Sequence, residues 1–410
     1  MLKKVSVEHL RVGMYIHEFC GSWMEHPFWR SQFKLSDPAD LRRIKKESDI
    51  TEVWIDVSRG DDVPATETVM EAASDADIES AADRTLLRTG APSPLFQTAP
   101  MAEELLRAEK ICARAKAAVI EMFQDVRMGN AISMEAAGAV VAEISGSVMR
   151  NSGALISLAR LKNADDYTYL HSVAVCALMT ALGRQLGLAD DVVKALGVAG
   201  LLHDLGKAHI PVSVLNKPGK LTDDEFAVIK SHPQLGFDTL LAHTTVGEIP
   251  LDVVLHHHEK TDGTGYPKRL QGDEISLYAK MGAVCDVYDA ITSNRPYKPG
   301  WDPAISISKM AEWCDGHFDQ RVFQAFVKCL GIYPIGSLVR LASGRLGVVV
   351  EQSEKSLLHP QVKVFFSTRA MAHIPNELVD LSQRGVKDKI LSRERAEAWG
   401  LKQVENLWAS

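Results

Sequence analysis

Residues 201 to 207 have the sequence LLHDLGK, in which the pair His203–Asp204 interrupts an apolar helical segment. Burying a carboxylate in such a segment costs free energy unless a cation compensates its charge. The same pair can also cap a helix end and serve as a counter-ion, and the dipeptide is common by chance. The stretch therefore indicates a helical core and leaves the role of its two polar residues open.

Helical patterns extend on both sides of this stretch, from about residue 101 to about residue 330. Between 101 and 128, apolar residues recur in steps of three and four along one stripe of a helix. The members of this stripe are Leu105, Ala108, Cys112, Ala115, Val119 and Met122. Further on, Thr222 and Glu225 form a capping box that predicts a helix start. The centre of the chain is therefore predicted to be an all-helical bundle.

The two ends of the chain have a different character. Strand patterns around a helix predict a small α/β domain at the N-terminus, and valine-rich alternation predicts a small β-rich unit near the C-terminus. The predicted fold class is mainly α. Its parts are an N-terminal domain (1–58), a linker rich in Ala, Ser, Asp, Thr and Pro (59–100), a helical connector (101–150), the bundle domain (151–333), the β unit (334–381) and a helical tail (382–410).

Composition limits the classes of function. The 410 residues carry a net charge of −7, which argues against binding along a nucleic acid polymer. No apolar run reaches the ~18 residues of a membrane span, and the first residues do not have the pattern of a signal peptide. Six scattered cysteines without a CxxC pair suit reduced thiols. These features predict a cytoplasmic protein.

Histidines gather in the predicted bundle. Eight of the fourteen fall between residues 171 and 258, and histidine is the commonest metal ligand. His171 lies in an apolar helical stretch, His232 precedes Pro233, and Asp286 interrupts a further apolar run. Each of them alone would more often be a packed or surface residue. Together they predict a metal site.

Several motifs in order resemble those of the HD-GYP family, a branch of the HD-domain metal-dependent phosphohydrolases. They are His171, HDLGK (203–207), SHP (231–233), HHE (257–259), DGTGYP (262–267) and CDVYDAITSNRPYKP (285–299). The resemblance covers about residues 150 to 335 and implies an HD-type bundle. It also implies a phosphodiesterase that opens cyclic di-GMP to pGpG, and onward to GMP, in bacterial signalling that governs biofilm and motility. Residues 1–58 resemble a regulatory domain of unassigned function often found ahead of HD-GYP domains.

The resemblance places the family's metal ligands on seven positions: His171, His203, Asp204, His232, His257, His258 and Asp286. A mixed nitrogen and oxygen site suits iron or manganese, with zinc and nickel as alternatives, better than magnesium alone. Asp204 stands between two sets of imidazoles, where it can bridge two ions about 3.5–4 Å apart. Some members carry a glutamate one turn before the first histidine, where this chain has Tyr167. We therefore expect two ions rather than three.

The first of the three consecutive histidines, His256, lies outside the family's HHE and is expected to be a surface residue or a support for the ligands. Lys207 lies one helical turn from His203 and can direct its charge to the same site. Asp204 and Lys207 are the residues that we expect to act in catalysis.

The substrate-binding residues implied by the resemblance are Lys207, Tyr266, Arg295 and Lys298. An arginine fork suits a phosphodiester, and Tyr266 can stack on or hydrogen-bond to a guanine. Without the family context, Lys207 and Lys298 would be taken for solvated surface charges, and Tyr266 for a packing residue of its loop.

Other functions stay open at this point. A cyclic di-GMP sensor or scaffold with little catalysis would keep the same residues. An HD phosphohydrolase for nucleotides or alarmones is disfavoured by the GYP loop, whereas cyclic GMP-AMP remains an alternative substrate. The sequence also leaves a homodimer open, and the resemblance implies diguanylate cyclases or other signalling proteins as partners.

Overall fold

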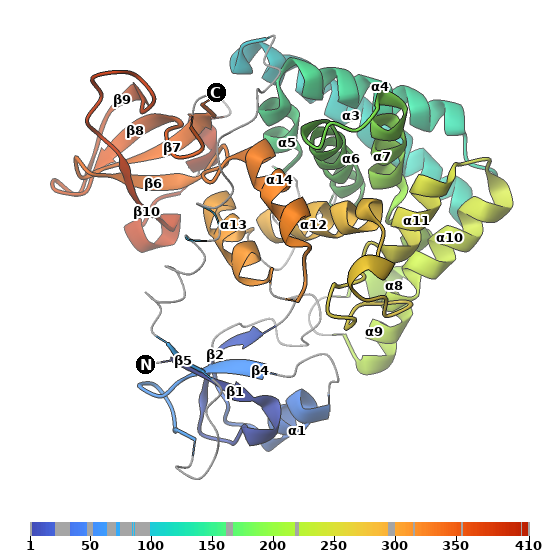
Figure 1. The fold of residues 1–410 in the computed structure, drawn as a ribbon, viewed down its shortest axis with the longest axis horizontal. Helices are drawn as coiled ribbons and strands as arrows, with labels where there is room; N and C mark the ends of the chain where they lie inside the picture. Colours follow the sequence, from blue (N-terminus) through green and yellow to red (C-terminus); the bar gives the residue numbers. More distant parts are fainter. Residues whose placement is uncertain are drawn as a thin grey trace.

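The computed structural model of the protein describes residues 2–20, 33–46, 52–63, 71–73, 84, 86, 99–160, 167–217, 221–293, 300–314, 316–353, 356–402 and 404–408. Figure 1 shows three parts: an N-terminal sheet in blue, a helical domain in cyan to orange, and a C-terminal β unit in orange to red. The expected class, mainly α with a small α/β unit and a small β unit at the two ends, is confirmed.

The described residues of the N-terminal part form a five-stranded antiparallel sheet together with the helix α1. Its elements are β1 (Leu2–Ser6), η1 (Val7–His9), β2 (Tyr15–Cys20), β3 (Phe33–Lys34), α1 (Pro38–Lys46), β4 (Glu52–Asp56) and β5 (Glu71–Ala73), in the strand order β3-β2-β4-β1-β5. Ile44 of α1 shares a core with Val5, Ile16 and Val53 of the strands. β5 lies in the segment predicted as a linker. Its three residues show no alternation of apolar and polar side chains, so the sequence did not predict a strand there. Backbone pairing with β1 defines this strand.

The helical domain runs from residue 101 to residue 330. Its elements are α3 (Met101–Met128), α4 (Met134–Arg150), α5 (Ser152–Arg160), α6 (Tyr167–Gln185), α7 (Asp190–Leu202), η3 (Leu205–His209), α8 (Val212–Leu215), α9 (Asp223–Lys230), α10 (His232–His243), α11 (Glu248–His256), η4 (Gly272–Glu274), α12 (Leu277–Thr292), α13 (Pro303–Glu312) and α14 (Gln320–Leu330). The capping box of Thr222 and Glu225 begins α9 as predicted.

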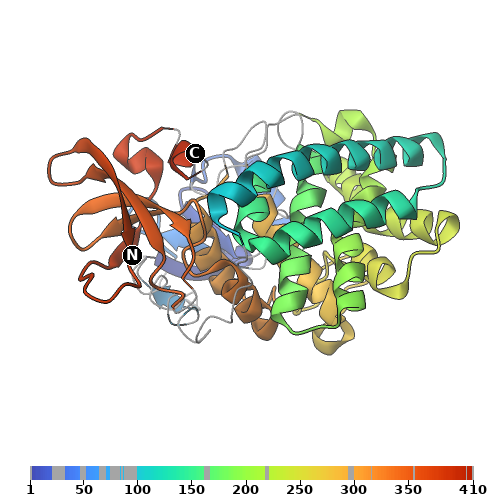
Figure 2. The same ribbon diagram turned by 90° about the horizontal axis from the view of Figure 1, so that it is seen from above.

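The centre of the helical domain is α6, which packs against α3, α4, α5, α7, α12 and α14. Its burial on all sides explains an apolar run without a polar face. Seen from above, α3 and α4 run side by side over the bundle (Figure 2). Both helices contribute buried residues to the same core as α6, among them Val119 and Val141. Residues 101–150, which we expected to be a helical connector, therefore form a layer of the bundle.

The β unit is a second five-stranded antiparallel sheet. Its strands are β6 (Leu338–Leu341), β7 (Arg345–Glu351), β8 (Gln361–Ser367), β9 (Ala372–Asp380) and β10 (Ile390–Arg393), in the order β10-β6-β7-β8-β9. The prediction of a helical tail over 382–410 was wrong in part, because β10 pairs with β6 and extends the sheet beyond residue 381. Among the described residues of this segment, only the short turns η5 (Ala396–Trp399) and η6 (Val404–Leu407) are helical. The helix formers at 393–399 obscured the four-residue strand before them.

Among the residues that the structure describes, no helix is both long and apolar enough to cross a membrane. The cysteines whose side chains are described, Cys112, Cys176, Cys285, Cys314 and Cys329, carry free thiols.

Candidate metal centre

Five segments of the helical domain bring the seven predicted ligands together. His171 lies in α6, His203 and Asp204 follow α7, and His232 is the first residue of α10. His257 and His258 follow the end of α11, and Asp286 lies in the middle of α12. The side chains of all seven are buried or nearly so, with His258 the most exposed at 9%. A set of polar side chains this deep in an apolar bundle needs a specific partner.

The seven side chains form two groups. One consists of Asp204, His232, His257 and His258, and we call it the Asp204 group. The other consists of His171, His203 and Asp286, and we call it the Asp286 group. Within each group the potential ligand atoms all lie within 4.8 Å of one another, which is close enough to surround one ion.

Hydrogen bonds to the backbone orient the imidazoles. The Nδ1 atoms of His203 and His232 lie 2.8 Å from the carbonyl oxygens of Gly200 and Ile229, and Nδ1 of His257 lies 3.0 Å from that of Val254. A carbonyl oxygen only accepts, so these Nδ1 atoms carry the proton and the Nε2 lone pairs face inward. The rings are therefore held in the tautomer that a metal ligand needs.

The inward-facing nitrogens crowd one another. The Nε2 atoms of His203 and His171 are 3.2 Å apart, and those of His232 and His257 are 3.3 Å apart. Lone pairs at this separation repel unless a proton or a metal ion lies between them. The arrangement is therefore one that a bound cation stabilises.

Asp204 belongs to the first group and also approaches two imidazoles of the second. Its Oδ1 is 3.2 Å from Nε2 of His232, and its Oδ2 is 3.4 Å from Nε2 of His203 and 3.5 Å from Nε2 of His171. Among the described residues, Asp204 Oδ1 and Asp286 Oδ2 are buried without a hydrogen-bond partner. Buried carboxylate oxygens are rarely left so, and divalent cations would satisfy both. The residues present therefore fit metal ions.

The protonation states of three of the ligands, Asp204, His257 and His258, suit metal binding. Burial alone would raise the pKa of Asp204, but the Lys207 ammonium holds that pKa well below its usual range. Burial and the neighbouring imidazoles lower the pKa of His257 to about 3. Burial likewise lowers the pKa of His258 well below the ordinary value. Near neutral pH these carboxylate and imidazole groups are in the forms that coordinate metals.

A glycine in the HDLGK motif permits the approach of the two halves of the site. A Cβ at Gly206 would collide with the carbonyl oxygen of His232 and would also meet the amide of Gly236. η3, which follows Asp204, can therefore lie directly on α10, which begins with His232. Gly206 lies within η3 and serves this close packing.

Asp289 is a site residue that the sequence analysis missed. Its Oδ2 lies 2.6 Å from Nδ1 of His171, and its side chain is only 3% exposed. It therefore orients His171 in the way that backbone carbonyls orient His203, His232 and His257. The available signal was its spacing, because a residue three positions after Asp286 on a helix lies on the same face.

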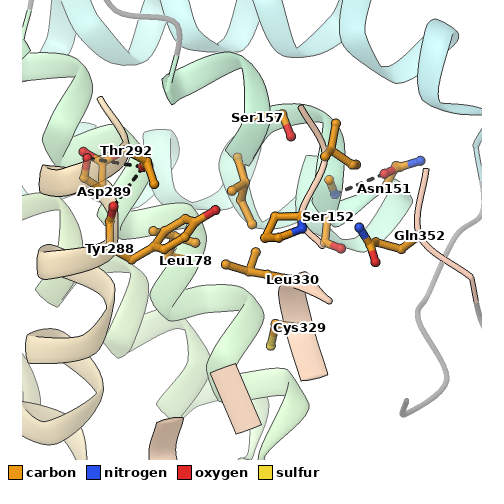
Figure 3. A pocket seen from close by; sticks show the side chains of 14 residues that line it. Asn151, Ser152, Ser157, Leu178, Tyr288, Asp289, Thr292, Cys329, Leu330 and Gln352 are labelled. Atoms are coloured by element: carbon orange, nitrogen blue, oxygen red, sulfur yellow. Dashed lines mark hydrogen bonds between the residues drawn. The ribbon is translucent and has the colours of Figure 1, made fainter. Parts of the chain in front are cut away.

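Asp289 also lines a small cavity. Figure 3 shows Asp289 and Thr292 at one end and Asn151 and Gln352 at the other. Its volume of about 30 Å³ is enough for one or two water molecules and far too small for a dinucleotide. The substrate must therefore approach the metal ligands from elsewhere.

The remaining predicted residues take different places. Lys207 donates to Oδ2 of Asp204 over 2.6 Å, so its charge does reach the site. The ring of Tyr266 stacks on the imidazole of His258 with centroids 4.6 Å apart, so one face of the tyrosine ring is occupied. His256 pairs with Asp252 through a 2.8 Å contact and belongs to neither group. Arg295, Lys298 and the side chain of Tyr167 lie outside the described residues.

Two family descriptions match the chain. Residues 2–137 match a domain of unknown function (DUF3391), and residues 151–322 match the HD domain. The first match extends beyond the N-terminal sheet and into α4. The second contains all seven residues of the two groups and implies that the chain binds divalent metal ions.

Similar proteins cover either the whole chain or a part of it. A cyclic di-GMP phosphodiesterase of Pseudomonas aeruginosa is 53% identical over 409 residues, which cover 100% of this chain and 96% of that protein. A cyclic di-GMP phosphodiesterase of Vibrio cholerae is 39% identical over 189 residues, 42% of this chain and 38% of that protein. A 3′3′-cGAMP-specific phosphodiesterase of the same organism is 36% identical over 166 residues, 40% of this chain and 38% of that protein.

Among solved structures, an HD-GYP-type protein from Bdellovibrio bacteriovorus is similar, with a TM-score of 0.46 and 18% sequence identity. The similarity covers 80% of this chain and 98% of that one.

Proposed function

The chain belongs to the HD-domain family, in its HD-GYP branch, and we propose that it is a metal-dependent phosphodiesterase that opens cyclic di-GMP to linear pGpG. The observation that carries this proposal is Asp204, a buried carboxylate that lies within 3.5 Å of imidazoles from both groups. The full-length similarity to a cyclic di-GMP phosphodiesterase supports the choice of substrate.

Two divalent ions would occupy the site, one in each group, with Asp204 shared between them. The donors are imidazole nitrogens and carboxylate oxygens, which favour iron or manganese and also admit zinc or nickel. Such ions polarise a phosphodiester and activate water for in-line attack on phosphorus. The residues that would hold them are Asp204, His232, His257 and His258 on one side, and His171, His203 and Asp286 on the other.

Lys207 has a role of its own. Its ammonium group is half-buried and already lies against Asp204, so it can donate a hydrogen bond to a phosphate oxygen bound beside that carboxylate. The positive charge would offset the charge that grows on phosphorus-bound oxygen during attack. Tyr266, Arg295 and Lys298 are proposed to bind the rest of the dinucleotide.

Metal analysis of anaerobically purified protein tests the metal centre. We expect two ions per chain in the wild type and a loss of metal in Asp204→Asn, which keeps the size of the side chain but removes its charge. His256→Ala is the matched control, because it removes a neighbouring imidazole that belongs to neither group. Loss of about one ion per chain in this control would contradict the assignment.

Turnover tests the reaction. Protein loaded with manganese or ferrous iron should convert cyclic di-GMP to pGpG, and Asp204→Asn should not. 3′3′-cGAMP belongs in the same assay, because a relative is specific for it. Faster hydrolysis of 3′3′-cGAMP would move the proposal to that substrate. Binding of cyclic di-GMP by metal-replete protein without any turnover would favour a sensor.

A further inference from the structure

The glutamate directly after the two histidines has a buried carboxylate that none of the roles above uses. Glu259 is only 2% exposed. Its Oε1 accepts a hydrogen bond from the amide of Lys268 over 2.6 Å, and its Oε2 accepts one from the amide of Leu270 over 3.0 Å. One carboxylate therefore holds two backbone amides of the loop that follows the GYP motif.

The residue between these two amides has an unusual backbone. Arg269 has a φ of +56°, in the left-handed region that residues other than glycine rarely adopt. Such a conformation persists only where the surroundings impose it. The carboxylate of Glu259 does so, because it fixes the amides on both sides of Arg269.

The start of the same loop is fixed to the backbone of the histidine segment. A Cβ at Gly265 would collide with the backbone of Glu259 and Lys260, so only glycine permits this approach. The amide of Tyr266 donates to the carbonyl oxygen of His258 over 3.1 Å. Tyr266 is thus held between the contact at Gly265 and the carboxylate of Glu259.

The ring of Tyr266 connects this loop to the metal centre. It stacks on the imidazole of His258, with a centroid distance of 4.6 Å and an interplanar angle of 27°, and it is half-buried. A small displacement of the loop would change where this ring lies beside the Asp204 group. The path from Glu259 to the site therefore runs through the loop backbone and ends at Tyr266.

We propose that Glu259 is a positioning residue that fixes the loop at Lys268 and Leu270 and thereby places Tyr266 for binding of the dinucleotide. This proposal rests on the proposed function. It separates the two halves of the motif: His257 and His258 hold metal, whereas Glu259 sets substrate affinity. A carboxylate that only stabilised the fold would not act through Tyr266.

Glu259→Gln tests this role, because its amide group can accept from only one of the two backbone amides. We expect KM for cyclic di-GMP to rise about tenfold. Loss of one charge-assisted hydrogen bond leaves the loop less ordered, and the energy of one such bond corresponds to about this change in affinity. We expect kcat to stay within about twofold and the metal content to stay unchanged. Glu274→Gln is the control. It removes a carboxylate that holds the amide of Gln271 in the neighbouring turn, and KM should not change.

A double-mutant cycle with Tyr266→Ala decides whether the effect passes through the ring. If it does, Glu259→Gln should leave KM unchanged in the Tyr266→Ala background. Additive effects on KM, or a loss of metal in Glu259→Gln, would overturn the proposal. If Glu259→Gln does not fold, Glu259→Asp replaces it, because the shorter side chain cannot hold both amides.

Binding provides a readout besides turnover. The Kd of a non-hydrolysable phosphorothioate analogue of cyclic di-GMP, measured by calorimetry on metal-replete protein, should rise in parallel with KM. If the wild type neither binds nor hydrolyses the dinucleotide, the proposed function fails. If the wild type is active and the cycle is additive, only the role of Glu259 fails.

Discussion

At the scale of single residues, the hydrogen bonds on the outer nitrogens of the imidazoles decide what their inner nitrogens can do. Backbone carbonyls serve this purpose for His203, His232 and His257, whereas His171 has the carboxylate of Asp289. A carboxylate is the stronger acceptor, and it makes the imidazole more basic toward a metal. His171 is therefore the ligand whose strength depends on another side chain.

Asp289→Asn should weaken metal binding without abolishing it. The amide oxygen can still accept from Nδ1 of His171, but the negative charge that strengthens the ligand is lost. We expect metal affinity to fall about 10–100-fold. Competition with a chelator of known affinity measures this change, and an affinity within about twofold of the wild type would show that Asp289 does not support the site.

At the scale of helices and turns, the contact between η3 and α10 sets the distance between Asp204 and His232. Gly206 makes this contact, and any side chain there would press on the carbonyl oxygen of His232. Gly206→Ala should therefore separate the two elements. We expect a loss of about 1–3 kcal/mol in the free energy of unfolding and a lower metal content. Urea unfolding and metal analysis of the same preparation check both.

A second glycine provides the matched control for this substitution. Gly187 follows α6 with a φ of +70°, and a Cβ there would meet nothing within 4 Å. Gly187→Ala should cost about 1 kcal/mol through backbone strain and leave the metal content unchanged. Equal metal loss in both variants would mean that lowered stability, and not the η3–α10 contact, causes it.

The motifs allowed the helical domain and the seven clustered side chains to be predicted, because each ligand stands in a stretch with a recognisable pattern. Two kinds of feature were not predicted. Asp289 acts across the space between α12 and α6, and Glu259 acts on amides nine and eleven residues away. Such contacts depend on tertiary packing. β5 and β10 escaped prediction because pairing with β1 and β6, more than their own side chains, defines them.

At the scale of the whole molecule, α3 belongs to two cores. Met101 and Leu105, in its first turns, pack against the core of the β unit, and Ala108 and later residues enter the core of the helical domain. At its other end, Arg127 donates to the carbonyl oxygen of Ala208 in η3, next to the metal centre. One helix thus connects the β unit with the segment that carries Lys207.

An ion pair with a buried carboxylate secures the first turns of α3 against α4. Glu104 is fully buried and accepts from Ser147 over 2.7 Å and from Arg150 over 2.7 and 2.8 Å, both in α4. Burial alone would raise the pKa of Glu104, but these hydrogen bonds outweigh it and lower the pKa. A carboxyl group whose pKa falls on folding stabilises the folded state above its unfolded pKa and loses that effect in acid.

Glu104→Gln should therefore destabilise the protein by about 2 kcal/mol at pH 7. The difference from the wild type should be full above the ordinary glutamate pKa of 4.5 and should shrink as the pH falls below it. Urea unfolding at a series of pH values measures the difference. The control is Glu143→Gln, which removes an exposed ion pair with Arg114. It should lower the free energy of unfolding by less than about 0.5 kcal/mol. If the difference in unfolding free energy between the wild type and Glu104→Gln does not depend on pH, the ionised carboxylate is not its cause.

Because α3 contributes to the cores of both the helical domain and the β unit, it limits which fragments of the protein can fold. Residues 151–333 contain every side chain of the two groups, yet a fragment with these ends would lack α3 and α4 and expose the apolar faces of α5, α6 and α7 that they cover. A fragment that keeps α3 but ends at residue 333 would leave Met101 and Leu105 uncovered. The smallest portion that keeps both cores closed therefore begins ahead of Leu86 and continues through Trp408. Deletion or fusion at the N-terminal sheet is the modification that leaves both cores intact.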